Sequence, residues 1–355
     1  MSGMSRRRWA GVTLSAFSLP ELLRASTRVL SHEPLITAQD FAQYPSVITP
    51  TDDFYVRNHF PIPDLDPTAW EMRVDGLVGQ PARFGLARLR QAHKADVAAV
   101  LECAGNANNM GGVGCARWQG VRLADILAMC KVDARARWVR LTGWDRGKEP
   151  DSPGEIHYSR TISLERATSP ATLLALGMNG EPLPAKHGAP CRALVAGHYG
   201  MDSVKWLQRI ELIDQPDESL FMARRFRRLS GETAGEAVSS MRVKSLVVKP
   251  AVDAVLRGSA CVAGGYAWTG KGSIARVEVR LDARPWQQCR LLSVSINLAW
   301  IPWSAQLEGI KAGNHQLTVR AFADTGDEQP AERDASRQDA YELNSYARTR
   351  FYIRP

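Results

Sequence analysis

One cysteine of this chain stands where a thiol can do chemistry. Cys103 follows the apolar run at residues 97–101 and precedes Gly105 and Asn106. The run has the length and β-branched content of a buried strand, and a Gly-Asn pair favours a turn. A thiol at the end of a buried strand, beside a turn, can contact a ligand. The alternative is that Cys103 is a small buried hydrophobe, as free cysteines usually are.

Three other segments combine charged donors with glycine, proline or aromatic residues. They span residues 54–59, 187–192 and 197–206. Arginine and lysine bind phosphate strongly, and glycine lets backbone amides approach it. Each histidine in these segments, taken alone, is more often a core or surface residue than a ligand. The candidate side chains are Arg57, Asn58, His59, His187, Arg192, Ser203 and Lys205.

The composition is that of a folded globular protein with room for two domains. The chain has 355 residues, of which 45% are hydrophobic and 23% charged. No stretch approaches the ~18 continuous apolar residues of a membrane span. The six cysteines form no Cys-x-x-Cys pair, so we expect neither a structural zinc site nor a disulfide scaffold.

The net charge of +8 indicates an anionic partner without identifying it. The basic cluster at residues 224–228 suits nucleic acid, although no nucleic-acid-binding motif accompanies it. A phosphorylated cofactor or a small oxyanion needs the same charge. At the amino terminus, residues 5–9 (Ser-Arg-Arg-Arg-Trp) are similar to a twin-arginine export signal, which predicts a periplasmic protein. The alternative is a basic amino terminus on a cytoplasmic protein.

Patterning divides the chain into three parts. Residues 1–50 form a leader and an irregular lead-in, and residues 51–238 mix short strands with brief helical patterns, such as 121–130, in an α+β arrangement. Residues 239–355 change character. The alternation at 274–281 and again at 317–322 predicts half-buried strands, and turns separate them. We therefore expect an immunoglobulin-like β-sandwich in this part.

Taken together, these segments resemble the sulfite oxidase family of molybdenum-cofactor (molybdopterin) oxidoreductases from about residue 50 to the carboxy terminus. The matching pieces agree in order and spacing. They are residues 54–59, 102–106, 116–118 with Gly120, 178–180, 183–184, 187–188 with Arg192, 203–206 and, in the second half, 265–270.

The resemblance implies a sulfite oxidase-type molybdopterin-binding domain followed by a dimerisation domain, and hence a homodimer. It implies that Cys103 is the thiolate ligand of a molybdenum-molybdopterin cofactor, for which a soft sulfur donor is suited. The cofactor transfers an oxygen atom to or from a small substrate, with sulfur-compound oxidation expected and reduction of S- or N-oxides as the alternative. Because the sequence has no haem-attachment Cys-x-x-Cys-His motif, we expect the electrons to pass to a separate carrier such as a c-type cytochrome. The implied cofactor contacts are Tyr55, Val56, Arg57, Asn58, His59, Asp145, His187, Arg192, Ser203, Val204 and Lys205.

The departures from the family pattern concern the substrate. Arg57 matches the first substrate arginine, but the second falls on Asn108 and the catalytic tyrosine falls on Phe226. The third arginine falls near Ile296 or Asn297. Because charge-assisted hydrogen bonds are worth roughly 1.5–3 kcal/mol each, we expect weak sulfite recognition. The alternative is that neighbouring cations such as Arg224, Arg225 or Arg227 compensate for the missing arginines.

Two readings of other classes use the same residue types. One is a cysteine hydrolase that pairs Cys103 with His59 or His187. The other is a nucleic-acid binder built on residues 224–228. Neither hypothesis explains the segment 197–206, which contains Lys205, or the segment 265–270.

Overall fold

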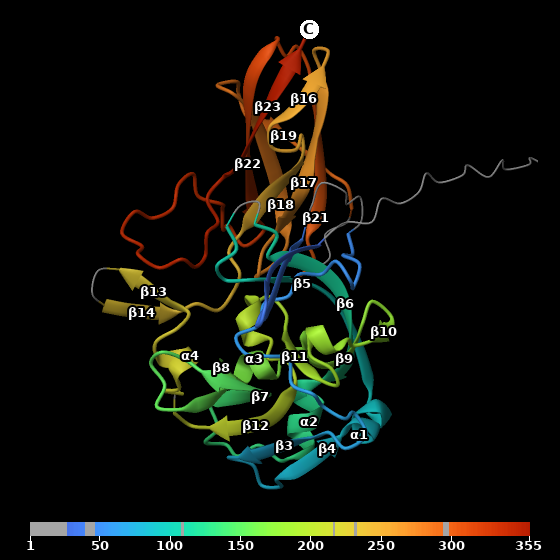
Figure 1. Ribbon diagram of the computed structural model, residues 1–355, viewed down its shortest axis with the longest axis vertical. Coiled ribbons are helices and arrows are strands. Elements are labelled where there is room, and N and C mark those ends of the chain that lie inside the picture. The colour runs from blue at the N-terminus through green and yellow to red at the C-terminus, as the bar shows by residue number, and fades with distance from the viewer. Residues whose placement is uncertain (1–26, 40–46, 108–109, 216, 231–232, 294–297) are drawn as a thin grey trace, which may run out of the picture.

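The computed structural model describes residues 27–39, 47–107, 110–215, 217–230, 233–293 and 298–355. Asn108, Ile296, Asn297 and residues 5–9, for which an export signal was predicted, lie outside these ranges. Figure 1 shows an elongated molecule with a mixed unit at one end and a β-sandwich at the other. No helix in the described ranges has the length and apolar character needed to cross a bilayer.

The mixed unit is built on two five-stranded sheets. The first has the order β10-β9-β6-β5, with β11 also paired to β9. Its strands are β5 (Lys94–Glu102), β6 (Val113–Arg122), β9 (Thr172–Met178), β10 (Glu181–Pro182) and β11 (Arg192–Val195). The predicted strand at residues 97–101 is thus confirmed as the end of β5.

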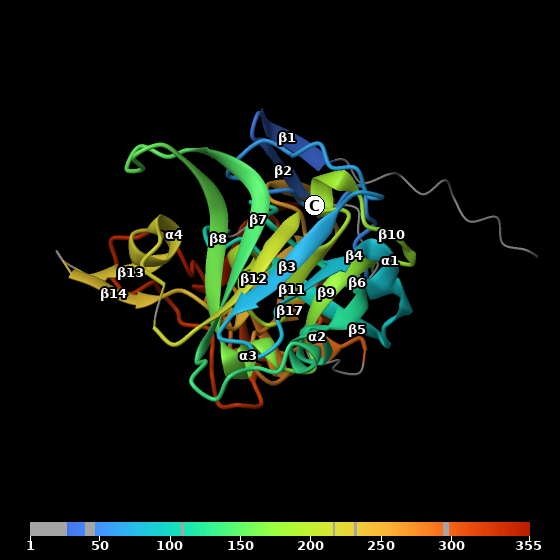
Figure 2. The same cartoon turned by 90° about the horizontal axis from the view of Figure 1, so that it is seen from below.

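The second sheet has the order β4-β3-β12-β7-β8. It comprises β3 (Glu71–Gly76), β4 (Ala82–Gly85), β7 (Trp138–Lys148), β8 (Glu155–Ser163) and β12 (Leu207–Ile213). Strands β3 and β12 run parallel, and the other neighbours run antiparallel. Figure 2 shows β7 and β8 curving beside β12 and β3. This mixed pairing agrees with the α+β prediction.

The helices of the described residues are short and sit beside these sheets. They are α1 (Leu86–Gln91), α2 (Leu123–Met129), α3 (Leu164–Ala167) and α4 (Leu220–Ala223), with the 3-10 turns η2 (Ala185–His187) and η3 (Gly200–Asp202). In α2, Leu123, Ile126 and Leu127 are buried, as their spacing predicts.

The second half forms two packed sheets, as expected for a sandwich. One sheet, β15-β17-β21-β20, contains β15 (Lys244–Lys249), β17 (Cys261–Trp268), β20 (Arg290–Leu291) and β21 (Ile301–Leu307). The other, β16-β23-β22-β18-β19, contains β16 (Ala254–Arg257), β18 (Ile274–Leu281), β19 (Gln287–Gln288), β22 (Gly313–Ala323) and β23 (Ala347–Arg354). The predicted alternation in β18 holds from Val277 onward. A register irregularity between Ile274 and Arg276 buries Ile274 in place of Ala275.

Two hairpins lie outside these sheets. One consists of β13 (Arg227–Ser230) and β14 (Thr233–Ala237), and the other of β1 (Thr27–His32) and β2 (Leu35–Gln39). The second hairpin corrects the expectation of an irregular lead-in before residue 50. Its strand β2 is fixed by distant backbone, because the Thr37 amide donates to Val56 and the Gln39 amide donates to Gly111. Local sequence does not reveal such partners.

The two units share buried contacts where β5 meets the sandwich. Tyr266, Trp268 and Trp300 of the sandwich belong to the same buried cluster as the core of the mixed unit. The rings of Tyr266 and Trp300 stack with centroids 4.5 Å apart. The segment 265–270, which carried part of the family resemblance, therefore lies at this junction.

A buried carboxylate links the two units at the end of β5. Glu102 is 1% exposed and accepts hydrogen bonds from Asn106 Nδ2 (3.0 Å), Lys244 Nζ (2.7 Å) and Trp268 Nε1 (2.9 Å). Lys244 begins β15 and Trp268 ends β17, so two of the three donors come from the sandwich. Lys244 also donates to the carbonyl of Asn106. The residue directly before Cys103 is thus fixed by side chains of both units.

We predict that Lys244→Met lowers the free energy of unfolding by about 3–5 kcal/mol, because it leaves the Glu102 carboxylate buried without its counter-ion. The double variant Glu102→Gln with Lys244→Met should recover much of this loss, since it removes both charges. Urea denaturation followed by tryptophan fluorescence measures both effects. Lys249→Met, at the exposed end of the same strand, is the matched control. A cost for Lys244→Met no larger than that of the control would contradict the prediction.

Candidate active site

A cavity of about 460 Å³ opens at the end of β5, next to Cys103. This volume lies in the usual range for sites of small ligands and cofactors. Most of the sequence-predicted site residues line it. They are Tyr55, Val56, Arg57, Asn58, His59, Cys103, Asp145, His187, Arg192, Ser203, Lys205 and Phe226.

One predicted residue within the described ranges, Val204, does not line the cavity. Val204 is 1% exposed, packs in the core and accepts a hydrogen bond from the Ala193 amide through its carbonyl. Asn108 lies outside the described residues.

Cys103 is held in a turn immediately after β5. Its amide donates to the Gly112 carbonyl (2.8 Å), and its own carbonyl accepts from the Asn106 amide (2.9 Å). Burial raises the pKa of the Cys103 thiol, while the Gly105 amide and the positive charge of Arg57 oppose that rise. A positively charged group bound in the cavity would favour the thiolate further.

A lysine and its neighbours form one side of the cavity. Lys205 precedes β12, and its ammonium donates to the Arg57 carbonyl (3.2 Å) and to Asn58 Oδ1. Burial and the nearby Arg192 lower the pKa of Lys205, and Asp145 acts against that shift. Burial also raises the pKa of Asp145, with Lys205 opposing it. The site thus carries buried cationic groups that an anion would stabilise.

Arg192 and His187 are two buried residues of the cavity wall. Arg192 is buried, lies 5.0 Å from the Trp118 ring centroid and donates to the carbonyls of His187 and Ser203, each at 3.0 Å. His187 Nε2 donates to the Thr51 carbonyl at 3.0 Å. Burial lowers the pKa of His187 to about 3, so the ring is neutral at physiological pH.

Three buried polar atoms of these residues lack a hydrogen-bond partner within the described part of the chain. They are Asn58 Nδ2, Asp145 Oδ1 and Arg192 Nε. Leaving a buried donor or acceptor unpaired costs about 1–3 kcal/mol, so natural proteins seldom tolerate it without a ligand or water. The cavity therefore fits a ligand with three parts. Its unpaired donors and acceptor suit a heterocycle, its cations suit an anionic group, and its thiol suits a metal with an affinity for sulfur.

A further group of cavity residues is aromatic or stacks on aromatic rings. His59 stacks on Tyr158 at 4.7 Å, and its ring centroid is 5.7 Å from that of Phe226. Burial and the nearby Arg57 lower the pKa of His59 to about 3. Phe226 adopts a left-handed backbone (φ 51°), which is costly for a bulky residue and frequent at functional sites.

The basic cluster at residues 224–228 is largely paired within the protein. Arg225 binds Glu149 (3.2 Å) and Asp151 (3.0 Å), and Arg228 binds Glu236 and Glu342. Arg227 donates to the Met222 carbonyl. These contacts leave little of the cluster for phosphates, so they give no support to the nucleic-acid reading.

The structure also gives no support to the hypothesis of a cysteine hydrolase. In the described ranges, no hydrogen bond joins Cys103 to His59 or His187, and burial makes both histidines weak bases. A cysteine nucleophile needs a base within hydrogen-bond reach.

Sequence reasoning missed several residues of the cavity. Tyr158, Met201 and Glu149 lie on its wall, as do Ala340 and Tyr341 from the sandwich. Tyr158 stands in an alternating strand, which indicates burial but not a site. Ala340 ends, and Tyr341 follows, a polar stretch that carried no functional signal.

Known protein families match both halves of the chain. The model of the oxidoreductase molybdopterin binding domain matches residues 59–221, and that of the Mo-co oxidoreductase dimerisation domain matches residues 235–347. Among curated proteins, the chain is 30% identical over 315 residues to sulfite oxidase of Gallus gallus, covering 80% of this chain and 68% of that protein. It is 32% identical over 273 residues to the mitochondrial sulfite oxidase of Rattus norvegicus, covering 69% of this chain and 50% of that protein.

Nitrate reductase [NADH] 2 of Phaseolus vulgaris is 30% identical over 328 residues, covering 80% of this chain and 37% of that protein. The chain thus spans about half of several relatives that it matches. Among solved structures, the sulfane dehydrogenase SoxCD from Paracoccus pantotrophus superposes with a TM-score of 0.81 at 24% identity, covering 96% of this chain and 92% of that chain. This likeness shows the fold.

Three findings identify the family of this chain. Two domain models match it, relatives are 30% identical or more, and the fold places a cysteine in a cation-lined cavity. The chain belongs to the sulfite oxidase family and is an oxidoreductase that uses a molybdenum-molybdopterin cofactor.

Proposed function

We propose that this oxidoreductase oxidises a small sulfur compound that carries less charge or more bulk than sulfite. The similarity to sulfite oxidases supports sulfur as the reacting atom. The observation that carries the proposal is the composition of the cavity wall. Arg57 is exposed there, whereas Arg225 is committed to Glu149 and Asp151, and Phe226 occupies the position predicted for a tyrosine.

The residues of the cavity suit the cofactor in distinct ways. Cys103 would supply a thiolate to the metal, which suits the preference of molybdenum for sulfur ligands. Arg192, His187 and Lys205 would hold the polar and anionic parts, and the unpaired atoms of Asn58, Asp145 and Arg192 would gain partners. When bound, the cofactor supplies two-electron oxygen-atom transfer chemistry.

The protein groups around the substrate would then bind and orient it. Arg57 would contact an anionic oxygen, and its charge also favours the Cys103 thiolate. His59, neutral because of its low pKa, would offer a hydrogen bond rather than a charge. Oxidation adds an oxygen atom from water to sulfur and releases two protons and two electrons. A separate one-electron carrier, such as a c-type cytochrome, would take up the electrons in two steps.

We further propose a homodimer located in the periplasm. The dimerisation-domain match supports the dimer, and exposed apolar residues of the sandwich, Val252, Val255 and Val262, are each more than half exposed in a single chain. The twin-arginine-like residues 5–9 support export, with a cytoplasmic protein as the alternative.

Protein purified from a host that makes the cofactor should hold about one molybdenum per chain. Cys103→Ser should stay folded but lose turnover, because a serine oxygen does not replace the soft sulfur donor. Elemental analysis and an assay with an artificial electron acceptor measure both. Cys261→Ser, at a partly exposed cysteine of the sandwich, is the matched control. Molybdenum-free wild-type protein, or full activity in Cys103→Ser, would contradict the proposal that Cys103 binds the molybdenum of the cofactor.

Light scattering at micromolar concentration should give twice the chain mass of 39.1 kDa. A two-fold dimer buries the same face of both copies, so the mass should not rise further with concentration. A monomer over this range would contradict the dimer.

Sulfite oxidation by the wild type should be slow or need high sulfite. Restoring the family pattern with Asn108→Arg and Phe226→Tyr together should lower the Michaelis constant for sulfite, since each change adds a donor for the oxyanion. Asn108→Gln with Phe226→Leu serves as the control pair. The proposal that the cavity recognises sulfite weakly would be wrong if the wild type oxidised sulfite with a micromolar Michaelis constant and the Asn108→Arg, Phe226→Tyr variant did not lower that constant.

A further inference from the structure

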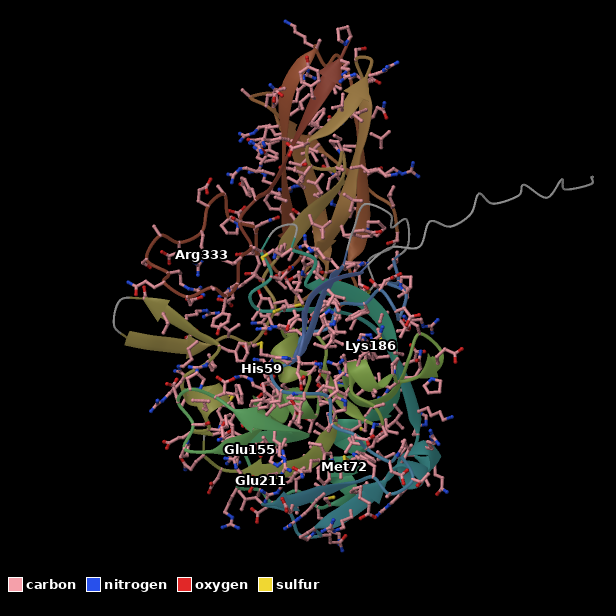
Figure 3. All side chains as sticks on the ribbon, in the orientation of Figure 1. His59, Met72, Glu155, Lys186, Glu211 and Arg333 are labelled. Atoms are coloured by element: carbon pink, nitrogen blue, oxygen red, sulfur yellow. The ribbon has the colours of Figure 1, made fainter. Side chains whose placement is uncertain are left out.

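One wall of the cavity comes from a long loop of the sandwich. The chain between β22 and β23 leaves the sandwich, passes beside the β13–β14 hairpin and returns (Figure 1). Figure 3 labels Arg333 on this loop and His59 in the mixed unit. Ala340 and Tyr341 of the loop line the cavity together with His59 and Cys103.

Two buried carboxylates flank Tyr341 and fix its position. Asp339 accepts from Arg337 Nε and Nη2, each at 2.7 Å, and from the amides of Leu229 and Tyr341, each at 2.9 Å. Burial alone would raise the pKa of Asp339, but the hydrogen bonds from Arg337 and the Leu229 amide hold it well below the usual range. The carboxylate therefore stays charged and the turn stays closed.

Glu342 secures the other side. It is 4% exposed and binds Arg228 (2.7 Å), Arg242 (3.2 Å) and Arg337 (3.1 Å). Its amide donates to the carbonyl of Ala104, the residue after Cys103, at 2.9 Å. The loop is thus attached to the same turn that carries the cysteine, and Tyr341 is held at the cavity by contacts on both sides.

Tyr341 and Phe226 form an aromatic surface. Their ring centroids lie 5.3 Å apart at an interplanar angle of 40°. The guanidinium of Arg160 lies 5.1 Å from the Phe226 ring centroid, on a side chain that is itself buried and bound to Asp202 at 2.8 Å. Within the described part of the chain, no hydrogen bond engages the Tyr341 hydroxyl, whereas that of Tyr158 donates to the Met201 carbonyl.

The cavity therefore offers one exposed guanidinium, Arg57, and a fixed apolar surface in the same space. Sulfite carries two negative charges when fully deprotonated, and its sulfur bears three oxygens and a lone pair. An organic sulfinate, R–SO₂⁻, keeps the sulfur lone pair and two oxygens, carries a single negative charge, and has a carbon group where sulfite has its third oxygen. Its anionic end matches a single arginine, and its carbon group matches an aromatic surface.

We propose that organic sulfinates are the substrate class of this enzyme, and that Tyr341, with Phe226, contacts their carbon group and determines specificity. This inference rests on the proposed function. The reaction is R–SO₂⁻ + H₂O → R–SO₃⁻ + 2H⁺ + 2e⁻. A sulfur–oxygen bond forms, both O–H bonds of water break, sulfur is oxidised, and the external one-electron carrier is reduced twice.

The test is steady-state kinetics of the holoenzyme with ferricyanide as acceptor, using benzenesulfinate and sulfite. Wild type should show kcat/KM for benzenesulfinate at least tenfold above that for sulfite. Tyr341→Ala should lower the benzenesulfinate value about tenfold through KM, which corresponds to ~1.4 kcal/mol of contact. Its effect on sulfite should stay within about twofold. Tyr341→Phe, which keeps the ring, should retain most of the benzenesulfinate value. Tyr352→Ala, at an exposed tyrosine of β23, is the matched control.

Calorimetric binding of the product, benzenesulfonate, gives a second readout that needs no turnover. Wild type and Tyr352→Ala should bind it equally, and Tyr341→Ala should bind it about tenfold more weakly. If sulfite is oxidised but benzenesulfinate is not, or if Tyr341→Ala affects both substrates equally, the inference fails while the proposed function stands. If no sulfur compound is oxidised but benzenesulfonate binding depends on Tyr341, the proposed function fails while the contact stands. If Tyr341→Ala binds benzenesulfonate as tightly as the wild type does, the proposed contact between Tyr341 and the carbon group is wrong.

Discussion

The buried carboxylate of Glu102 joins the turn that carries Cys103 to the sandwich. It ends β5, directly before Cys103, and its three hydrogen-bond donors come from the Cys103 turn, β15 and β17. A carboxylate this deeply buried is tolerated only when its partners are all in place. The sandwich is therefore required to hold the cysteine turn, and the two units form one site rather than two independent folds.

The cavity combines features that are unfavourable without a ligand. Burial lowers the pKa of Lys205 and of Arg192, and three polar atoms of the wall lack partners in the described ranges. An anionic cofactor would supply both the missing charge and the missing hydrogen bonds. Folded stability and ligand affinity are linked in such a site, because a ligand that binds only the folded state stabilises it. The strained backbone of Phe226 fits the same pattern.

Much of the fold and site could be predicted from sequence because the signals are local. The apolar run before Cys103, the spacing in α2 and the alternation in β18 each reflect which side chains are buried. The residues around Arg57, His187 and Lys205 carried the family resemblance as short motifs, and the structure brings them to one cavity. The place of Tyr341 in the cavity wall could not be predicted from sequence. Its own segment has the composition of a polar loop, and Phe226, which it contacts, is more than 100 residues away in the chain. The partners of the 224–228 arginines were hidden for the same reason, because Glu149 and Glu342 are distant in sequence. The β1–β2 hairpin depends on backbone partners that no side-chain pattern encodes.

We infer that the Cys103 thiolate binds the molybdenum of a cofactor held in the cavity at the end of β5. X-ray absorption at the molybdenum K-edge of the purified holoenzyme tests it most directly, by comparing wild type with Cys103→Ser. The variant should retain molybdenum, and its extended fine structure should show one sulfur neighbour fewer, with an oxygen neighbour in its place. An unchanged set of sulfur neighbours in Cys103→Ser would show that this cysteine is not a ligand, and the account of the site would be wrong.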